Sequence, residues 1–333
     1  MVYLLLAILC GSLFSIVFKL GQINGADGRQ VILFNYSIAF LFTLLPILGH
    51  VVLDREASFG SYVPDALSSW LLAVVQGAFF VTGFNVMDRS TRRTGVALTT
   101  VCARASLILP VLLSWMLLGQ PAPAWLPVLL TVAAMVLIVG PSGSDSTRQS
   151  TRRNISRKPS DTSSPVLMQP EQASSDVGSR SKGVYGMLAL LGVFLVFGLS
   201  DFFLKVVQHT VEKGNAADPV LMESRLSGLT CIIFLMASLA SLAVCLVSGS
   251  FRRNKVTRAT VGWGALLGIA NIGCTSCMLR ALGVMPTGLY YPLYNIGIVV
   301  VATFAGLIFF RERLKWPQAA GLALALAAIA FSF

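Results

Sequence analysis

Ionisable side chains inside long apolar segments are the residues of this sequence best placed to do chemistry. The clearest is Arg104, in the middle of the apolar stretch 95–118. A charged side chain at the centre of a bilayer costs at least ~2.5–3.5 kcal/mol on insertion scales, so such a residue is a candidate for a binding site. We expect Arg104 to face a central cavity and neutralise an anionic group of a substrate, or to pair with Glu223 when the site is empty. A permanent buried ion pair that only fixes the packing is the alternative.

Other charged residues also interrupt apolar segments. Asp201 and Lys205 are four residues apart, so on a helix they could pair with each other. A role for Asp201 in binding a coupling proton or ion is the alternative. Lys19 and Lys205 lie near the ends of their segments, where long side chains extend toward water. Glu223 and Arg225 are two apart and point to different sides of a helix, so at least one of them needs another partner.

Polar and aromatic residues gather in the first half of the segment 287–310. They surround Pro292, where a lipid-facing helix would carry Leu, Ile and Val. Anchoring of the tyrosines at the membrane interface would be the ordinary explanation; lining of a central cavity is the functional one. Including polar residues of other segments, the residues expected to bind a substrate are Arg104, Asn271, Tyr291, Tyr294, Asn295, Glu223, Arg225 and Asn35.

The composition is that of a membrane protein. Of the 333 residues, 55% are hydrophobic and 12% are charged, and the mean hydropathy is +0.77. Soluble domains carry about twice that share of charge. The net charge of +11 does not indicate a nucleic-acid partner, because Lys and Arg belong at the cytoplasmic ends of membrane spans. The sequence therefore predicts an all-α integral membrane protein, and we expect it in a bacterial inner membrane.

Ten apolar segments follow one another along the chain. Segment 287–310 would form a helix ~36 Å long, enough to cross a hydrocarbon core ~30 Å thick. The stretch 141–182 is rich in Ser, Thr, Arg and Pro, which predicts a disordered linker between domains 1–140 and 183–333. The predicted spans are 1–20, 31–52, 69–87, 95–118, 123–139, 185–207, 219–247, 261–282, 287–310 and 316–332.

The two halves of the chain look duplicated. Thr94–Trp125 and Thr287–Trp316 both begin Thr-Gly, hold polar residues first, contain a proline (Pro110 or Pro292) and end in a turn before Trp. Because each half has an odd number of spans, the halves must enter the membrane in opposite orientations. Two inverted five-helix repeats are typical of secondary transporters, which bind their substrate between the repeats.

The loops indicate an orientation. Lys and Arg concentrate in the loops that follow odd-numbered spans and in the linker. This bias places the linker in the cytoplasm and both termini outside. The spacing of Gly264 and Gly268 further predicts a face on which another helix packs closely.

Motifs of catalysis and of cofactor binding are missing from the sequence. It contains no GxxxxGK[ST], HExxH or GxSxG pattern, so we expect neither an enzyme nor a cofactor. The pair Cys274 and Cys277 has the spacing of metal ligands, but it has no second pair and no nearby His, so we expect no metal.

Together with the repeats, two turns carry a family resemblance. They read Arg311-Glu312-Arg313-Leu314 and Gly119-Gln120-Pro121, each after the fourth span of its half. In these features the chain resembles the drug/metabolite transporter superfamily with EamA-type repeats. It departs from that pattern in having Gln120 for an acidic residue, and in its termini, which lie inside in most members of the superfamily.

The resemblance implies export or uptake of a small metabolite. The expected function is secondary transport of a small polar or amphipathic metabolite by alternating access, with membrane lipid around the protein and a coupling proton or ion as a further partner. A flippase for a lipid-linked substrate is an alternative. An integral membrane enzyme or a scaffold without transport belongs to a different class.

Overall fold

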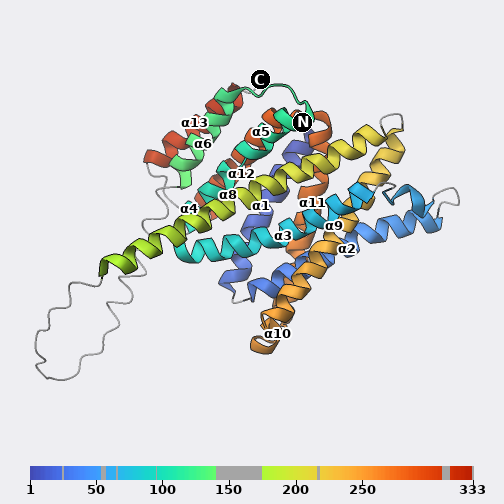
Figure 1. Cartoon of the computed structure of the whole chain (residues 1–333), viewed down its shortest axis with the longest axis horizontal. Helices are drawn as coiled ribbons and strands as arrows, with labels where there is room; N and C mark the ends of the chain where they lie inside the picture. Colours follow the sequence, from blue (N-terminus) through green and yellow to red (C-terminus); the bar gives the residue numbers. More distant parts are fainter. Residues whose placement is uncertain are drawn as a thin grey trace, which may run out of the picture.

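The computed structural model of the chain describes residues 1–24, 26–53, 58–64, 67–94, 96–139, 175–215, 218–309 and 316–331, and these are helical throughout apart from short connections (Figure 1). No strand occurs within these ranges. The helices are α1 (Val2–Ile23), α2 (Gly28–Leu53), the 3-10 turn η1 (Phe59–Ser61), α3 (Leu67–Thr94), α4 (Val96–Ala105), α5 (Ile108–Leu118), α6 (Trp125–Val139), α8 (Ser175–Gly214), α9 (Pro219–Val247), α10 (Ser250–Arg253), α11 (Arg258–Val284), α12 (Thr287–Phe309) and α13 (Trp316–Ala330).

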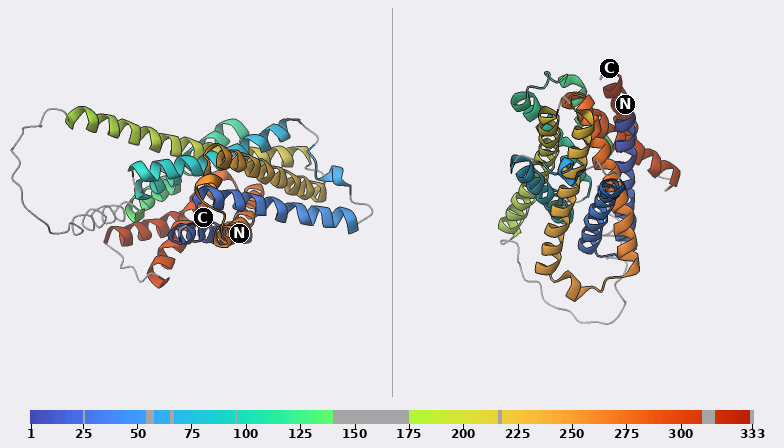
Figure 2. Two further views of the ribbon diagram at one scale, coloured as in Figure 1. Left: turned by 90° about the horizontal axis from the view of Figure 1, so that it is seen from below. Right: turned by 90° about the vertical axis from the view of Figure 1, so that its right-hand side faces the viewer.

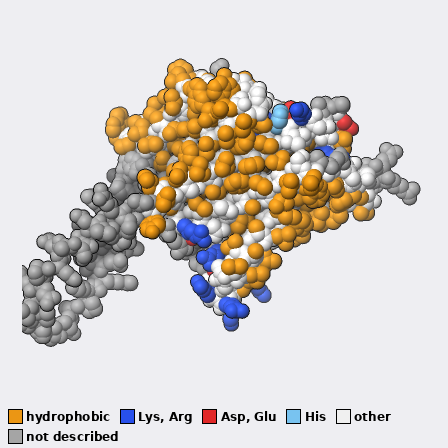
Figure 3. All heavy atoms as spheres, viewed as in Figure 1, with side chains coloured by type: hydrophobic (Ala, Val, Ile, Leu, Met, Phe, Trp, Pro, Cys, Tyr) orange, Lys and Arg blue, Asp and Glu red, His pale blue; other side chains and the backbone are white. Residues whose placement is uncertain are grey.

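The helices have the length and the surface of membrane spans. Within the described ranges, six helical stretches are long and apolar enough to cross a membrane, and four shorter ones are apolar. Large apolar side chains such as Leu45, Leu117 and Val247 are exposed on the outside of the bundle. Figure 3 shows hydrophobic side chains over most of one face and Lys and Arg at its lower end, near α10. The chain is therefore an α-helical integral membrane protein.

The helices pack in pairs that join distant parts of the chain. α1 packs on α11 and α12, and α8 packs on α3, α4 and α5. α2 packs on α9 and α11, and α9 also packs on α3. α6 and α13 pack on each other at the side of the bundle (Figure 1). The start of α1 and the end of α13 lie at one end of the bundle and α10 lies at the other (Figure 2).

The fourth predicted span is not one continuous helix. α4 ends at Ala105 and α5 begins at Ile108. Pro110 has no backbone N–H, so it cannot donate to the carbonyl of Ser106 four residues earlier. That carbonyl accepts from the N–H of Leu109 instead, at 2.9 Å. The predicted fourth span thus contains a break at residues 106 and 107, but Thr99–Leu118 is still long and apolar enough to cross a membrane. Arg104 lies in the last turn of α4, where the helix dipole favours a cation.

The predicted linker and the predicted turn of the second half lie largely outside the described residues. α8 begins at Ser175, within the stretch 141–182 assigned to the linker, and no proline interrupts the helix between there and the following span. Residues 140–174 and the turn 311–314 lie outside the described residues. In the first half, Gly119 ends α5 with φ 64°, a left-handed cap that favours glycine.

The predicted close packing at Gly264 and Gly268 is confirmed. A Cβ atom on Gly264 would lie 2.4 Å from the Cβ of Phe34, and one on Gly268 would lie 2.7 Å from the carbonyl oxygen of Asn35. Both contacts are on α2, so these glycines allow the backbones of α2 and α11 to approach each other.

Candidate binding site in the helix core

A chain of hydrogen bonds joins three helices in the middle of the bundle. Nη1 of Arg104, at the end of α4, donates to Oδ1 of Asn295 on α12 at 3.2 Å. Nδ2 of Asn295 donates to the carbonyl oxygen of Tyr291 at 3.0 Å. The hydroxyl of Tyr291 donates to the carbonyl oxygen of Asp201 on α8 at 2.6 Å. These hydrogen bonds thus join three predicted binding residues, Arg104, Tyr291 and Asn295, to Asp201, one of the predicted coupling residues. Together with Tyr294, a fourth predicted binding residue, they form what we call the core cluster.

The core cluster contains two ionisable side chains, Arg104 and Asp201, and both are half-buried. The carboxylate of Asp201 interacts electrostatically with the guanidinium of Arg104. Tyr291 is fully buried, and Asn295 is 4% exposed. Ionisable groups in such surroundings interact more strongly than they do in water.

Aromatic rings form one wall of the core cluster. The rings of Tyr290 and Tyr294 stack with centroids 5.5 Å apart, and the hydroxyl of Tyr294 lies 3.1 Å from Sγ of Cys274 on α11. All three tyrosines of this stretch are buried, so the alternative that they anchor the protein at the membrane interface is wrong. On the facing helix α1, a Cβ atom on Gly11 would lie 2.9 Å from the Tyr294 hydroxyl, so a larger side chain would disturb this wall.

Asn35 and Asn271 form a separate pair. Nδ2 of Asn271 on α11 donates to Oδ1 of Asn35 on α2 at 3.3 Å. Both residues were predicted to bind substrate, but they contact each other in the α2–α11 interface. The fully buried Nδ2 of Asn35 has no hydrogen-bond partner among the described residues. The pair therefore links the two helices and is not part of the core cluster.

Glu223 pairs with a residue that was not predicted as part of a site. Its carboxylate forms an ion pair with Arg280 of α11, so the predicted pairing with Arg104 is wrong. Glu223 lies near the start of α9. Arg225, two residues later, is buried, in agreement with the prediction that the two residues need different partners. Arg280 is the sole basic residue of the predicted span 261–282, which was the signal for it.

The sequence led us to expect that Lys205 pairs with Asp201 or extends to water, and both expectations are wrong. Lys205 is 2% exposed, and its Nζ donates to the carbonyl oxygen of Leu282 and to Oε1 of Gln208, both at 2.7 Å. The carbonyl oxygens at the end of α11 attract a cation, which favours this position for the ammonium of Lys205. Nε2 of Gln208 continues the chain to Oε2 of Glu212 at 2.7 Å. The side chain of Lys19 lies outside the described residues.

A polar clamp ties the α10 end of the bundle together. Oδ2 of Asp27, between α1 and α2, accepts from Oγ of Ser250 at 3.0 Å and from Nδ2 of Asn254 at 2.6 Å. Burial raises the pKa of the Asp27 carboxyl, but the hydrogen bonds from Asn254, Ser250 and the N–H of Arg29 outweigh it, so the pKa lies below its usual value. A carboxylate with a lowered pKa stabilises the fold above the usual pKa, and that contribution is lost as the pH falls through the lowered one.

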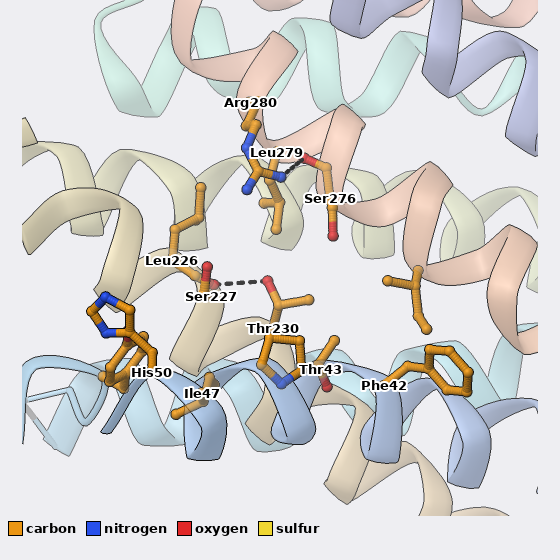
Figure 4. Close-up of a pocket in the computed structure, with 13 residues that line it drawn as sticks. Phe42, Thr43, Ile47, His50, Leu226, Ser227, Thr230, Ser276, Leu279 and Arg280 are labelled. Carbon is orange, nitrogen blue, oxygen red and sulfur yellow. Dashed lines mark hydrogen bonds between the residues drawn. The ribbon is translucent and has the colours of Figure 1, made fainter. Parts of the chain in front are cut away.

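The opposite end of the bundle is hollowed. A cavity of about 370 Å³ lies between α2, α9 and α11, which we call the outer cavity (Figure 4). A second cavity, of about 200 Å³, borders α8, α9 and α11. The two cavities share Leu226, Leu279 and Arg280 as lining residues. The described structure thus has the Asp27 clamp at the α10 end and two cavities at the other.

Replacing Asp27 by Asn is expected to loosen the clamp. The sulfur of Cys245 lies beneath it, fully buried and 3.4 Å from the carbonyl oxygen of Arg29. In a variant that keeps Cys245 as its single cysteine, Asp27→Asn should therefore speed alkylation by N-ethylmaleimide at neutral pH. Asp218→Asn, which alters a carboxylate at the other end, is the matched control. Equal alkylation rates in all three proteins would contradict a closing role for the clamp.

Comparisons with known proteins concern the whole chain. No protein-family model matches this sequence. The chain is 22% identical over 329 residues to an uncharacterized protein of Haemophilus influenzae, in an alignment covering 98% of this chain and 95% of that protein. It is similar to a protein of known crystal structure with a TM-score of 0.66, at 14% identity, covering 99% of this chain and 96% of the other. At such identity the likeness shows a shared fold alone.

Proposed function

We propose that the protein is a secondary transporter that binds a small polar or amphipathic metabolite at the core cluster and releases it by alternating access. The observation that carries this proposal is the chain of hydrogen bonds from Arg104 through Asn295 and Tyr291 to the backbone of Asp201, inside an apolar helix bundle. Charges at that depth are costly and typically serve substrates or ions. The break between α4 and α5 supports the same function, because interrupted helices supply binding groups in transporters.

The pairing of helices supports two inverted repeats of five spans. In the proposed repeats the helices correspond in order: α1 to α8, α2 to α9, α3 to α11, α4–α5 to α12, and α6 to α13. When each helix is replaced by its counterpart, the main packed pairs of helices are reproduced. The pair of α1 and α11 corresponds to that of α8 and α3, and the pair of α1 and α12 to that of α8 with α4 and α5. The pairs α2–α9 and α6–α13 correspond to themselves. In this proposal the shorter apolar helices also span the membrane, which makes ten spans.

The two ends of the bundle fit one conformation of an alternating-access cycle. Basic residues follow α9 around α10, which by the positive-inside rule is the cytoplasmic end. The Asp27 clamp holds that end and the cavities hollow the other, so in the proposal we assign this conformation to the outward-facing state. In the proposal the protein lies in a bacterial cytoplasmic membrane and functions like members of the drug/metabolite transporter superfamily.

A thermal-stability screen tests whether the core cluster is a binding site. A bound metabolite raises the melting temperature of the purified protein, because a ligand that binds only the folded state stabilises it. A metabolite that binds the core cluster should stabilise the native protein and fail to stabilise Arg104→Gln, and liposomes containing the native protein should take it up. Stabilisation of both proteins alike, or binding without uptake, would speak against the proposal.

A further inference from the structure

The outer cavity has the size and the lining of a small-molecule site. Its volume of about 370 Å³ lies within the range of known ligand pockets. Apolar side chains such as Phe42, Ile47 and Ile272 share its walls with the hydroxyls of Thr43, Ser227 and Thr230. Figure 4 shows Arg280 across the cavity from Thr43 and Ile47 of α2, and His50 at one end. The lining can thus contact the apolar part of a ligand and form hydrogen bonds with its polar groups.

The charges around the outer cavity select for an anion. Arg280 is its one Lys or Arg, and no Asp or Glu stands among the described residues that line it. The carboxylates of Glu212 and Glu223 line the second cavity instead, on the other side of Arg280. A ligand in the outer cavity therefore approaches the guanidinium from a side that no Asp or Glu lines, and the carboxylate with which it competes for Arg280 is that of Glu223.

Arg280 can accept another partner. Its Nη1 donates to the carbonyl oxygen of Ser276 at 3.2 Å, and its Nη2 pairs with Oε1 of Glu223. A guanidinium has five N–H donors, so these contacts leave donors for a further group. The side chains of Arg280 and Glu223 are 31% and 47% exposed, and ion pairs so open to solvent are weak. A ligand carboxylate can thus join or replace Glu223 at little cost.

We propose that the outer cavity is a second binding site, for a small organic anion whose carboxylate is held by Arg280 and whose apolar body lies against α2. This site is separate from the core cluster, and binding to it can be measured whether or not the protein transports.

The test uses benzoate as the probe, with benzylammonium and benzyl alcohol as its cationic and neutral counterparts. Titration calorimetry on the full chain in lipid nanodiscs should show benzoate binding, with the other two weaker by about tenfold or more. Arg280→Gln should weaken benzoate by a similar factor. Glu223→Gln should strengthen it, because a competing carboxylate is removed; this gain also excludes simple misfolding as the cause.

Two controls separate this site from other basic residues. Arg252→Gln, at the α10 end, and Arg104→Gln, in the core cluster, should both bind benzoate as the native protein does. Loss of binding in Arg104→Gln would assign benzoate to the core cluster and overturn the proposal. So would unchanged binding in Arg280→Gln, no binding of benzoate at all, or equal binding of the three probes.

Discussion

Replacing Arg104 by Gln is expected to reduce solute uptake by at least about tenfold, the effect of losing one charge-assisted contact to a substrate. Glutamine keeps an amide that can hydrogen-bond to Oδ1 of Asn295, but it carries no charge to neutralise an anionic group or to balance Asp201. The melting temperature should fall as well, because the carboxyl of Asp201 loses the cation that favours its charged form. Uptake into proteoliposomes of a metabolite found by the stability screen, together with thermal melts, measures both effects.

A second substitution separates binding from packing. In the double variant Arg104→Gln with Asp201→Asn, the core contains neither charge, so the melting temperature should recover while uptake remains low. Arg253→Gln, at the α10 end, is the control that also removes one arginine. Unchanged uptake in Arg104→Gln would mean that Arg104 only fixes the packing, which is the alternative set out from the sequence.

Replacing Gly268 by Ala is expected to destabilise the protein by about 1–3 kcal/mol, the usual cost of overpacking a tight interface. The new methyl group would lie 2.7 Å from the backbone carbonyl oxygen of Asn35, an atom that cannot move without shifting α2. The buried contact between Asn35 and Asn271 depends on the same approach of α2 to α11. Unfolding in mixed detergent micelles measures the loss.

Gly262 provides the matched control on the same helix. A Cβ atom there would meet nothing within 4 Å, so Gly262→Ala should leave stability unchanged or raise it slightly through better helix propensity. If Gly268→Ala and Gly262→Ala unfolded at the same point, the contact between α2 and α11 would not be as close as described.

The helices could be predicted largely from hydropathy, because the thickness of a bilayer sets the length of an apolar span. The predicted span 219–247 coincides with α9, and 316–332 differs from α13 by two residues at its end. The break before α5 could not be predicted in the same way. A proline within an apolar segment can bend a helix or interrupt it, and Pro292 leaves α12 continuous whereas Pro110 follows a break.

The sequence predicted which polar residues lie in the helix core better than it predicted which residues they contact. Arg104, Tyr291 and Asn295 share a cluster, as their polar character within apolar segments suggested. Lys205, however, donates a hydrogen bond to the carbonyl oxygen of Leu282, and Glu223 forms an ion pair with Arg280. Both contacts arise from the packing of α8, α9 and α11. The spacing of residues along one helix predicts contacts only within that helix. Contacts between different helices therefore could not be predicted from it.

Solute counterflow tests the proposed carrier most directly. Liposomes containing the native protein are loaded with the unlabelled metabolite and diluted into a trace of the labelled one, without ATP. A carrier that exposes one central site to either side in turn should accumulate label transiently above its outside concentration, and Arg104→Gln should not. Label that only equilibrates, or that fails to enter, would contradict a carrier built around the core cluster.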